Sequence, residues 1–109
     1  HKPVGVEVTV SEFDKGKPYL TPFDHPVIQA AGRSYEKVYK VPTAFTRGGG
    51  SIPIVASFDE ILNLPVVLMG FGLSSENFHA PNEHFHLENF DQGLRVLSDY
   101  LYEVSLLTL

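Results

Sequence analysis

The sequence predicts an α/β protein in which helices pack on the faces of a sheet. Three observations support this fold class. Apolar residues recur at helical spacing in three segments, a continuous apolar run at 65–70 has the character of a strand buried on both faces, and helices alternate with strands along the chain. Such alternation is typical of layered α/β architectures. The length of 109 residues fits one small domain.

The first predicted element is a strand. Val4, Val6, Val8 and Val10 alternate with Gly5, Glu7 and Thr9, and a period of two indicates a strand with one apolar face. An irregular stretch at 17–22 separates this strand from the α/β unit that follows it.

The next predicted element is an amphipathic helix at 26–39. Asp24 is the expected N-cap and Pro26 lies in the first turn, while Pro42 prevents the helix from continuing. Residues 43–46 are predicted as a short strand. The apolar face of the helix contains Val27, Ala31, Tyr35 and Val38.

The second half of the chain has the same alternation. A glycine-rich loop at 47–51 precedes a helix predicted over 52–62, and the buried strand at 65–70 follows it. A long polar loop at 72–88 then leads into a final helix, for which Asn89 and Asp91 are the expected caps. Long loops in small domains are often functional. The buried stripe of the final helix is predicted to contain Leu94, Leu97, Leu101, Val104 and Leu107.

Composition excludes several classes of function. The chain has 8 basic and 13 acidic residues and a net charge of −5, which argues against nucleic acid as a partner. It has no apolar run near the ~20 residues of a membrane span and no visible secretory signal, so we expect a soluble, cytoplasmic protein without a membrane partner. Because the chain has no cysteine, any metal must be bound by His, Asp or Glu, which suits zinc or manganese.

The glycine-rich loop is a candidate anion site. Gly48, Gly49 and Gly50 let a ligand approach the backbone, and the N-terminus of the following helix favours an anion. The Ser51 hydroxyl adds a donor, and Arg47 offers a fork for a carboxylate. A flexible turn before an ordinary helix is the alternative. The loop is not a P-loop, because no Lys-Ser/Thr pair follows the glycines.

The long polar loop contains the candidate metal ligand, His79. It follows the predicted buried strand, and open α/β sheets bind ligands beyond the carboxyl ends of their strands. A solvent-exposed histidine without a ligand role is the ordinary alternative. His84 and His86 form a second conceivable metal pair. Asn82 and Glu83 are predicted to support His79 from outside the metal's own ligand shell.

Three segments together resemble the M20 metallopeptidase family, in its branch of non-specific and carnosine-type dipeptidases. They are TRGGGSIPI at 46–54, VVLMGFGL at 66–73 and HAPNE at 79–83, with Ser51 and His79 separated by 28 positions. Residues 17–19, 23–26 and 100–105 also resemble this branch, so the likeness covers nearly the whole chain.

The resemblance implies a site with two zinc ions, in which His79 is one metal ligand. It also implies that Gly49, Gly50 and Ser51 receive the substrate's carboxylate, while Arg47 matches the arginine that precedes this loop in the family. Gly48 stands where relatives often have an acidic residue. Residues 13–109 would form the C-terminal part of an αβα layered zinc-peptidase catalytic domain. Residues 1–12 would form the last strand of its lid domain, through which the full-length protein is expected to be a homodimer.

The family's remaining ligands are missing from this chain. Neither a His-x-Asp triplet nor a Glu-Glu pair, which contains the family's general base, occurs in it. A catalytic zinc usually has three protein ligands, so we expect a fragment without catalytic residues of its own, inactive by itself. The resemblance implies a dipeptide or small N-acyl amino acid as substrate. The alternatives are a related deacylase or desuccinylase, and a non-catalytic carboxylate-binding module.

Overall fold

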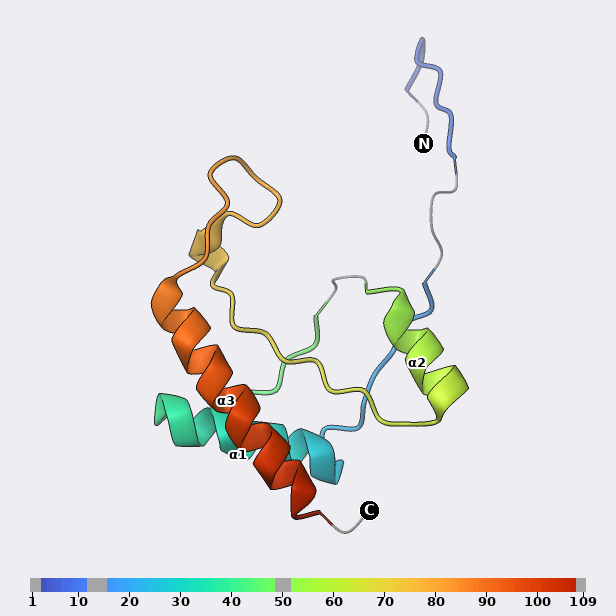
Figure 1. Cartoon of the computed structure of the whole chain (residues 1–109). Helices are drawn as coiled ribbons and strands as arrows, with labels where there is room; N and C mark the ends of the chain where they lie inside the picture. Colours follow the sequence, from blue (N-terminus) through green and yellow to red (C-terminus); the bar gives the residue numbers. More distant parts are fainter. Residues whose placement is uncertain (1–2, 12–15, 49–51, 108–109) are drawn as a thin grey trace.

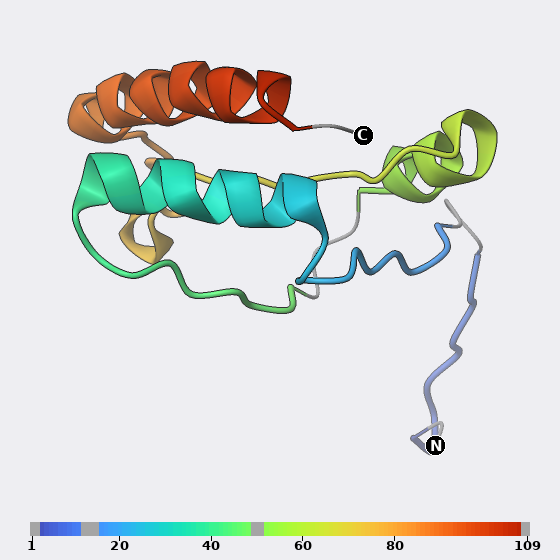
Figure 2. The same ribbon diagram turned by 90° about the horizontal axis from the view of Figure 1, so that it is seen from below.

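A computed structural model describes residues 3–11, 16–48 and 52–107. Its regular elements, in chain order, are the helices α1 (Pro26–Tyr39) and α2 (Ile54–Leu62), the 3-10 turn η1 (Ser74–Glu76) and the helix α3 (Leu87–Ser105). Helices α1 and α3 lie against each other, and α2 stands apart from them (Figures 1 and 2). The molecule therefore has a packed helix pair and a second, more open region.

Helix α1 confirms the predicted range, but its N-cap is not the predicted one. His25, rather than Asp24, is the N-cap, and its Nδ1 accepts from the backbone N–H of Val27 at 3.4 Å. The C-cap of the helix is Lys40, whose φ of 60° is left-handed and whose N–H donates to the carbonyl of Glu36. This ending is a common way to satisfy a carbonyl of the last turn.

The helix pair contains most of the buried core. Ser34 is fully buried, and its hydroxyl donates to the Ala30 carbonyl at 3.1 Å, so burial leaves its proton satisfied. Burial of small side chains lets two helices approach closely. The buried residues of the pair are Val27, Ala30, Ala31, Gly32 and Ser34 on α1, and Gly93 and Val96 on α3.

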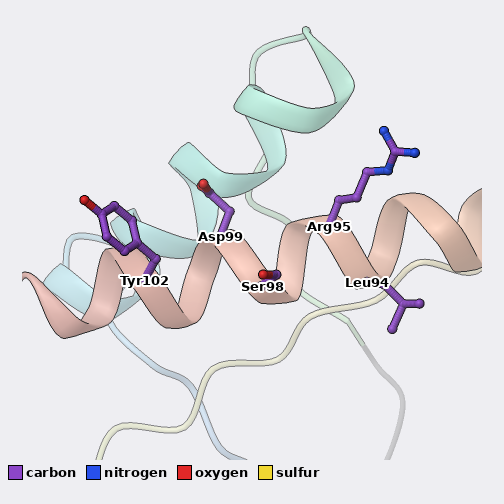
Figure 3. Close-up of a pocket in the computed structure, with 5 residues that line it drawn as sticks. All are labelled: Leu94, Arg95, Ser98, Asp99 and Tyr102. Atoms are coloured by element: carbon purple, nitrogen blue, oxygen red, sulfur yellow. The ribbon is translucent and has the colours of Figure 1, made fainter.

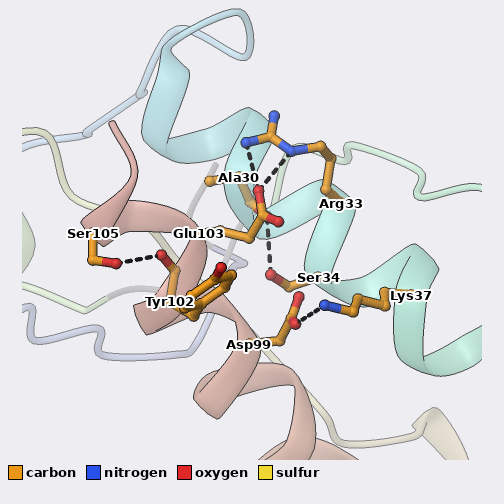
Figure 4. A network of polar contacts seen from close by, with 8 residues as sticks. All are labelled: Ala30, Arg33, Ser34, Lys37, Asp99, Tyr102, Glu103 and Ser105. Carbon is orange, nitrogen blue, oxygen red and sulfur yellow. Dashed lines mark hydrogen bonds and ion pairs between the residues drawn. The ribbon is translucent and has the colours of Figure 1, made fainter. Parts of the chain in front are cut away.

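Two ion pairs join the helices at one edge (Figure 4). Arg33 contacts Glu103 at 2.8 Å, and Lys37 contacts Asp99. The hydrogen bond from Lys37 holds the pKa of Asp99 below its usual range, and the same bond raises the pKa of Lys37. Both cationic side chains are more than half exposed, so these pairs contribute little to the stability of the helix pair.

Helix α3 begins earlier than the sequence predicts. Its N-cap is His86, whereas the predicted caps have other roles. The side-chain amide of Asn89 donates to the Phe71 carbonyl at 3.1 Å, and Asp91 pairs with Arg95 one turn later at 2.8 Å. The prediction of Asn89 and Asp91 as caps is therefore wrong. The backbone N–H of the N-cap, His86, donates instead to the side-chain carboxylate of Glu76, ten residues earlier.

Helix α2 occupies most of its predicted range but buries little of its surface. Val55 and Ala56 are its buried residues, whereas Ile61 is 79% exposed. An exposed ion pair between Lys17 and Glu60, at 2.5 Å, also contacts this helix. The C-cap of this helix is Asn63, which is left-handed with a φ of 50°.

The described residues contain no β-strand. The segments at 4–10, 43–46 and 65–70 have no strand partner there, and a strand needs a neighbour to complete its backbone hydrogen bonds. At Val66 side chains take this role, since the N–H donates to the Tyr19 hydroxyl at 3.1 Å and the carbonyl accepts from the Thr21 hydroxyl at 2.5 Å. The layered αβα sheet is therefore not confirmed and stays a prediction.

The molecule is extended and exposes much apolar surface. Its radius of gyration is 18.3 Å, whereas ~13 Å is typical of a compact domain of this size. The valines of the predicted first strand are all exposed, and this segment leads away from the helices (Figure 1). Within the described ranges no helix combines the length and apolarity needed to cross a membrane.

Candidate metal and carboxylate site

The loop that carries His79 is built from consecutive tight turns between η1 and α3. The N–H of Ala80 donates to the Asn77 carbonyl at 3.0 Å, and the N–H of Glu83 donates to the Ala80 carbonyl at 3.2 Å. Asn77, His79 and Asn82 have φ values of 55°, 59° and 61°. Asparagine and histidine are among the residues that adopt this left-handed region most readily. The sequence of the loop thus suits its backbone.

His79 is exposed on this loop, which projects away from the helix pair (Figure 1). The parts of the chain that the structure describes contain no cluster of three or more His, Cys, Asp or Glu able to hold a metal. A catalytic zinc site usually has three protein ligands and a water. Within the described residues, His79 is thus accessible to a metal, but no complete metal site is formed.

Glu76 closes the base of the same loop. Its carboxylate is fully buried and accepts from the N–H of Leu73 at 2.7 Å and from the N–H of His86 at 2.8 Å. The Nδ1 atom of His86 lies 2.7 Å from the same carboxylate oxygen. Burial alone would raise the pKa of Glu76, but the backbone donors and the His86 ring together lower it to about 2. The carboxylate is thus a charged acceptor for both ends of the loop.

Sequence reasoning did not find Glu76. It lies among serines and asparagines in a polar loop, where a surface carboxylate is the ordinary expectation. Gly72 is the one local signal, because a Cβ there would lie 3.2 Å from the Glu76 carboxylate and 2.4 Å from the Phe78 ring. A glycine shortly before an acidic residue is too common to be informative without the structure.

The two residues predicted to support His79 lie in the same loop, three and four positions after it. The Nδ1 of His84 lies 2.9 Å from the backbone carbonyl oxygen of Asn82, and Glu83 is exposed. Their roles stay predictions. The rings of His84 and His86 are 5.3 Å apart and tilted by 59°. The Nδ1 of His84 contacts the Asn82 carbonyl, whereas the Nδ1 of His86 contacts the Glu76 carboxylate.

The predicted carboxylate loop is described in part. Gly49, Gly50 and Ser51 lie outside the described residues, whereas Arg47 precedes them with an exposed side chain. The position of this arginine leaves it accessible to an anionic ligand. The part played by the glycines and the serine stays a prediction.

A hollow also lies on α3 (Figure 3). It is lined by Leu94, Arg95, Ser98, Asp99 and Tyr102, all from that helix. Arg95 is paired with Asp91, and none of the residues predicted to bind metal or substrate lines the hollow. It is therefore separate from the candidate site.

Comparison with known proteins identifies the family. Residues 2–103 match the model of peptidase family M20/M25/M40, and the chain belongs to this family. It is 39% identical over 72 residues to the Cys-Gly metallodipeptidase DUG1 of Saccharomyces cerevisiae, which covers 66% of this chain and 15% of that protein. The corresponding protein of Schizosaccharomyces pombe is 27% identical over 99 residues, or 91% of this chain and 21% of its own length.

The fold agrees with this family. A solved structure of the dipeptidase Dug1p from Saccharomyces cerevisiae superposes with a TM-score of 0.77 at 33% identity, over 81% of this chain and 18% of the solved one. The helices and loops described above thus have the arrangement of part of a peptidase. The chain spans about a fifth or less of the length of these relatives.

Proposed function

We propose that this chain is the C-terminal part of a zinc-dependent dipeptidase that hydrolyses dipeptides or similar small amides. The observation that carries this proposal is the family match over residues 2–103. The likeness in fold to a dipeptidase over 81% of the chain supports it. The relatives named as metallodipeptidases support the substrate class and the use of a metal.

His79 contributes one zinc ligand in this proposal. Its exposed imidazole, on a loop whose ends are fixed, suits one position in the coordination shell of a metal. A zinc ion bound in such a site polarises the scissile carbonyl and lowers the pKa of its water. The other ligands and the general base come from segments outside residues 1–109, so the chain alone is inactive.

The glycine loop and Arg47 bind the substrate's carboxylate in this proposal. Three glycines and a serine at 48–51 precede α2, which begins at Ile54, and a helix N-terminus favours an anion. The exposed guanidinium of Arg47 offers two parallel donors. Fixing the free carboxylate would favour dipeptides over long chains.

The exposed apolar surface supports a role within a larger protein. The segment at 4–10 and the outer face of α2 present valine, isoleucine, leucine and phenylalanine to solvent. Other segments of a complete peptidase would cover them, with residues 1–12 as a strand of the lid domain and residues 13–109 in the catalytic domain. The full-length protein would then be a homodimer through the lid.

Hydrolysis by the full-length protein tests this function. We expect zinc-dependent cleavage of a dipeptide, and we expect His79→Ala to abolish it while the protein remains folded. His84→Ala is the matched control, because His84 is an exposed histidine of the same loop. Wild-type activity in His79→Ala would remove His79 from the site. Equal losses in both variants would favour a general role of the loop over a ligand role of His79.

A further inference from the structure

Glu76 joins the two ends of the loop that carries His79. Its carboxylate accepts backbone hydrogen bonds from Leu73, before the loop, and from His86, after it. Its own N–H donates to the Leu73 carbonyl at 3.0 Å, and its own carbonyl accepts from the N–H of His84 at 3.1 Å. One residue thus fixes the entry and the exit of a loop of some ten residues.

The surroundings of this carboxylate leave it little freedom. It is fully buried, and an ionised carboxyl group that loses water needs all its hydrogen bonds within the protein. An ionised carboxylate can only accept hydrogen bonds. In the contact at 2.7 Å, the N–H at Nδ1 of His86 therefore donates a hydrogen bond to the Glu76 carboxylate. Gly72 lies so close that a Cβ there would be 3.2 Å from the carboxylate oxygen.

The fixed ends of the loop are joined to the helix pair. His86 is the N-cap of α3, so the Glu76 carboxylate lies at the positive end of that helix. On the entry side, the carbonyl of Gly70 accepts from the Tyr35 hydroxyl of α1 at 2.9 Å. The next carbonyl, of Phe71, accepts from Asn89 of α3. Glu76 therefore connects the loop to the most firmly packed part of the molecule.

We propose that Glu76 is a positioning residue for the metal site, which holds the His79 loop so that the imidazole meets the zinc ion. This inference rests on the proposed role of His79 as a ligand. His79 has a left-handed φ of 59°. A loop whose ends were free would hold neither this backbone conformation nor a fixed position of the imidazole. Fixing the loop before the metal binds lowers the entropy that metal binding must overcome.

A capping residue with no effect on the metal is the competing explanation. Both roles predict that loss of Glu76 weakens the start of α3. They differ in whether Glu76 acts through His79. If it does, removing the carboxylate should matter only while the imidazole is present. A double-mutant cycle measures this dependence directly.

The experiment uses the full-length protein and the zinc affinity of the wild type, Glu76→Gln, His79→Ala and the double variant. Affinity is measured by competition with a chromophoric chelator. We expect Glu76→Gln to weaken zinc binding about 10–100-fold, as is usual for groups that orient metal ligands. We expect the double variant to bind zinc no more weakly than His79→Ala alone. Dipeptide hydrolysis by Glu76→Gln should lose kcat with little change in KM, because the carboxylate loop is untouched.

Two further variants guard against a trivial result. Glu88→Gln is the matched control, because Glu88 is an exposed glutamate in the first turn of α3, and we expect wild-type zinc affinity. His86→Ala removes the half-exposed ring but keeps both backbone donors, so the protein should fold even if Glu76→Gln does not. We expect it to weaken zinc binding in the same direction but by less.

The possible outcomes separate this inference from the proposed function. Wild-type affinity in Glu76→Gln, or losses that add in the double variant, would overturn the positioning role while His79 remains a ligand. If Glu76→Gln does not fold, wild-type affinity in His86→Ala would overturn it. Unchanged zinc affinity in His79→Ala would contradict the proposed function itself. Weaker zinc binding in Glu76→Gln, with no further loss when Glu76→Gln is added to His79→Ala, would support both the positioning role and the proposed function.

Discussion

The two regions of this molecule differ in how far their own residues complete them. In the first, α1 and α3 bury Val27, Ala30 and Val96 against each other, and the His79 loop is joined to them through Glu76. In the second, α2 and the extended segments leave most of their apolar side chains in solvent. Both regions have similar apolar patterns in the sequence. What separates them is that α1 and one face of α3 bury apolar side chains against each other, whereas α2 and the segment 4–10 find few such partners among the described residues; the outer face of α3, with Leu94 and Leu101, stays exposed as well.

The largest expected effect comes from placing a charge in each region. Val96 is 0% exposed, so Val96→Asp would bury an unpaired carboxylate and should cost about 4 kcal/mol or more of unfolding free energy in the 109-residue chain. Ile61 is 79% exposed, and Ile61→Asp should change the unfolding free energy by less than about 0.5 kcal/mol. Urea unfolding measures both. Equal losses would mean that the second region is as well packed as the first.

Acid should weaken the first region through Glu76. The folded pKa of this carboxyl is about 2, below its ordinary value of 4.5. The carboxylate therefore stabilises the fold fully above about pH 4.5, and this contribution is lost as the pH falls towards about 2. Urea unfolding across this range should show less acid sensitivity in Glu76→Gln than in the wild type. An unchanged pH dependence would contradict the buried, hydrogen-bonded carboxylate.

A smaller effect is expected at the junction of the two regions. The Tyr35 hydroxyl of α1 donates to the Gly70 carbonyl at 2.9 Å, at the end of the apolar segment 65–70. Tyr35→Phe keeps the ring beside Phe71 but should cost about 1 kcal/mol in unfolding free energy. Tyr102→Phe, at an exposed tyrosine of α3, is the control and should have almost no effect. Identical values for the two variants would show that the junction contributes nothing.

The sequence predicts the ranges of the helices well because their signals are local. The stripe predicted to be buried on α3 is wrong at Leu94, Leu97 and Leu101, which are 54%, 41% and 70% exposed, whereas Gly93 and Val96 are buried. Helical spacing of apolar residues gives α1 its range and α2 most of its range, and left-handed Lys40 and Asn63 end them. The helix starts were predicted less well. His25 replaces Asp24 as the cap of α1, and α3 begins at Leu87 because the carboxylate of Glu76, distant in sequence, receives the N–H of its N-cap.

The site could be predicted only in part, since its groups come together from separate segments. Nothing local distinguishes His79 from other exposed loop histidines, and its ligand role depends on the likeness to a family. Glu76 was not predictable, because its importance comes from two backbone donors that only the folded loop brings together. The predicted sheet depends on strand partners that the described residues do not contain.

The zinc content of the full-length protein tests the ligand role of His79 most directly. Elemental analysis of purified wild type, His79→Ala and His84→Ala would give the zinc bound per chain. We predict that His79→Ala loses at least one zinc ion per chain, whereas His84→Ala retains the wild-type content. Unchanged zinc content in His79→Ala would contradict the assignment of this histidine as a metal ligand.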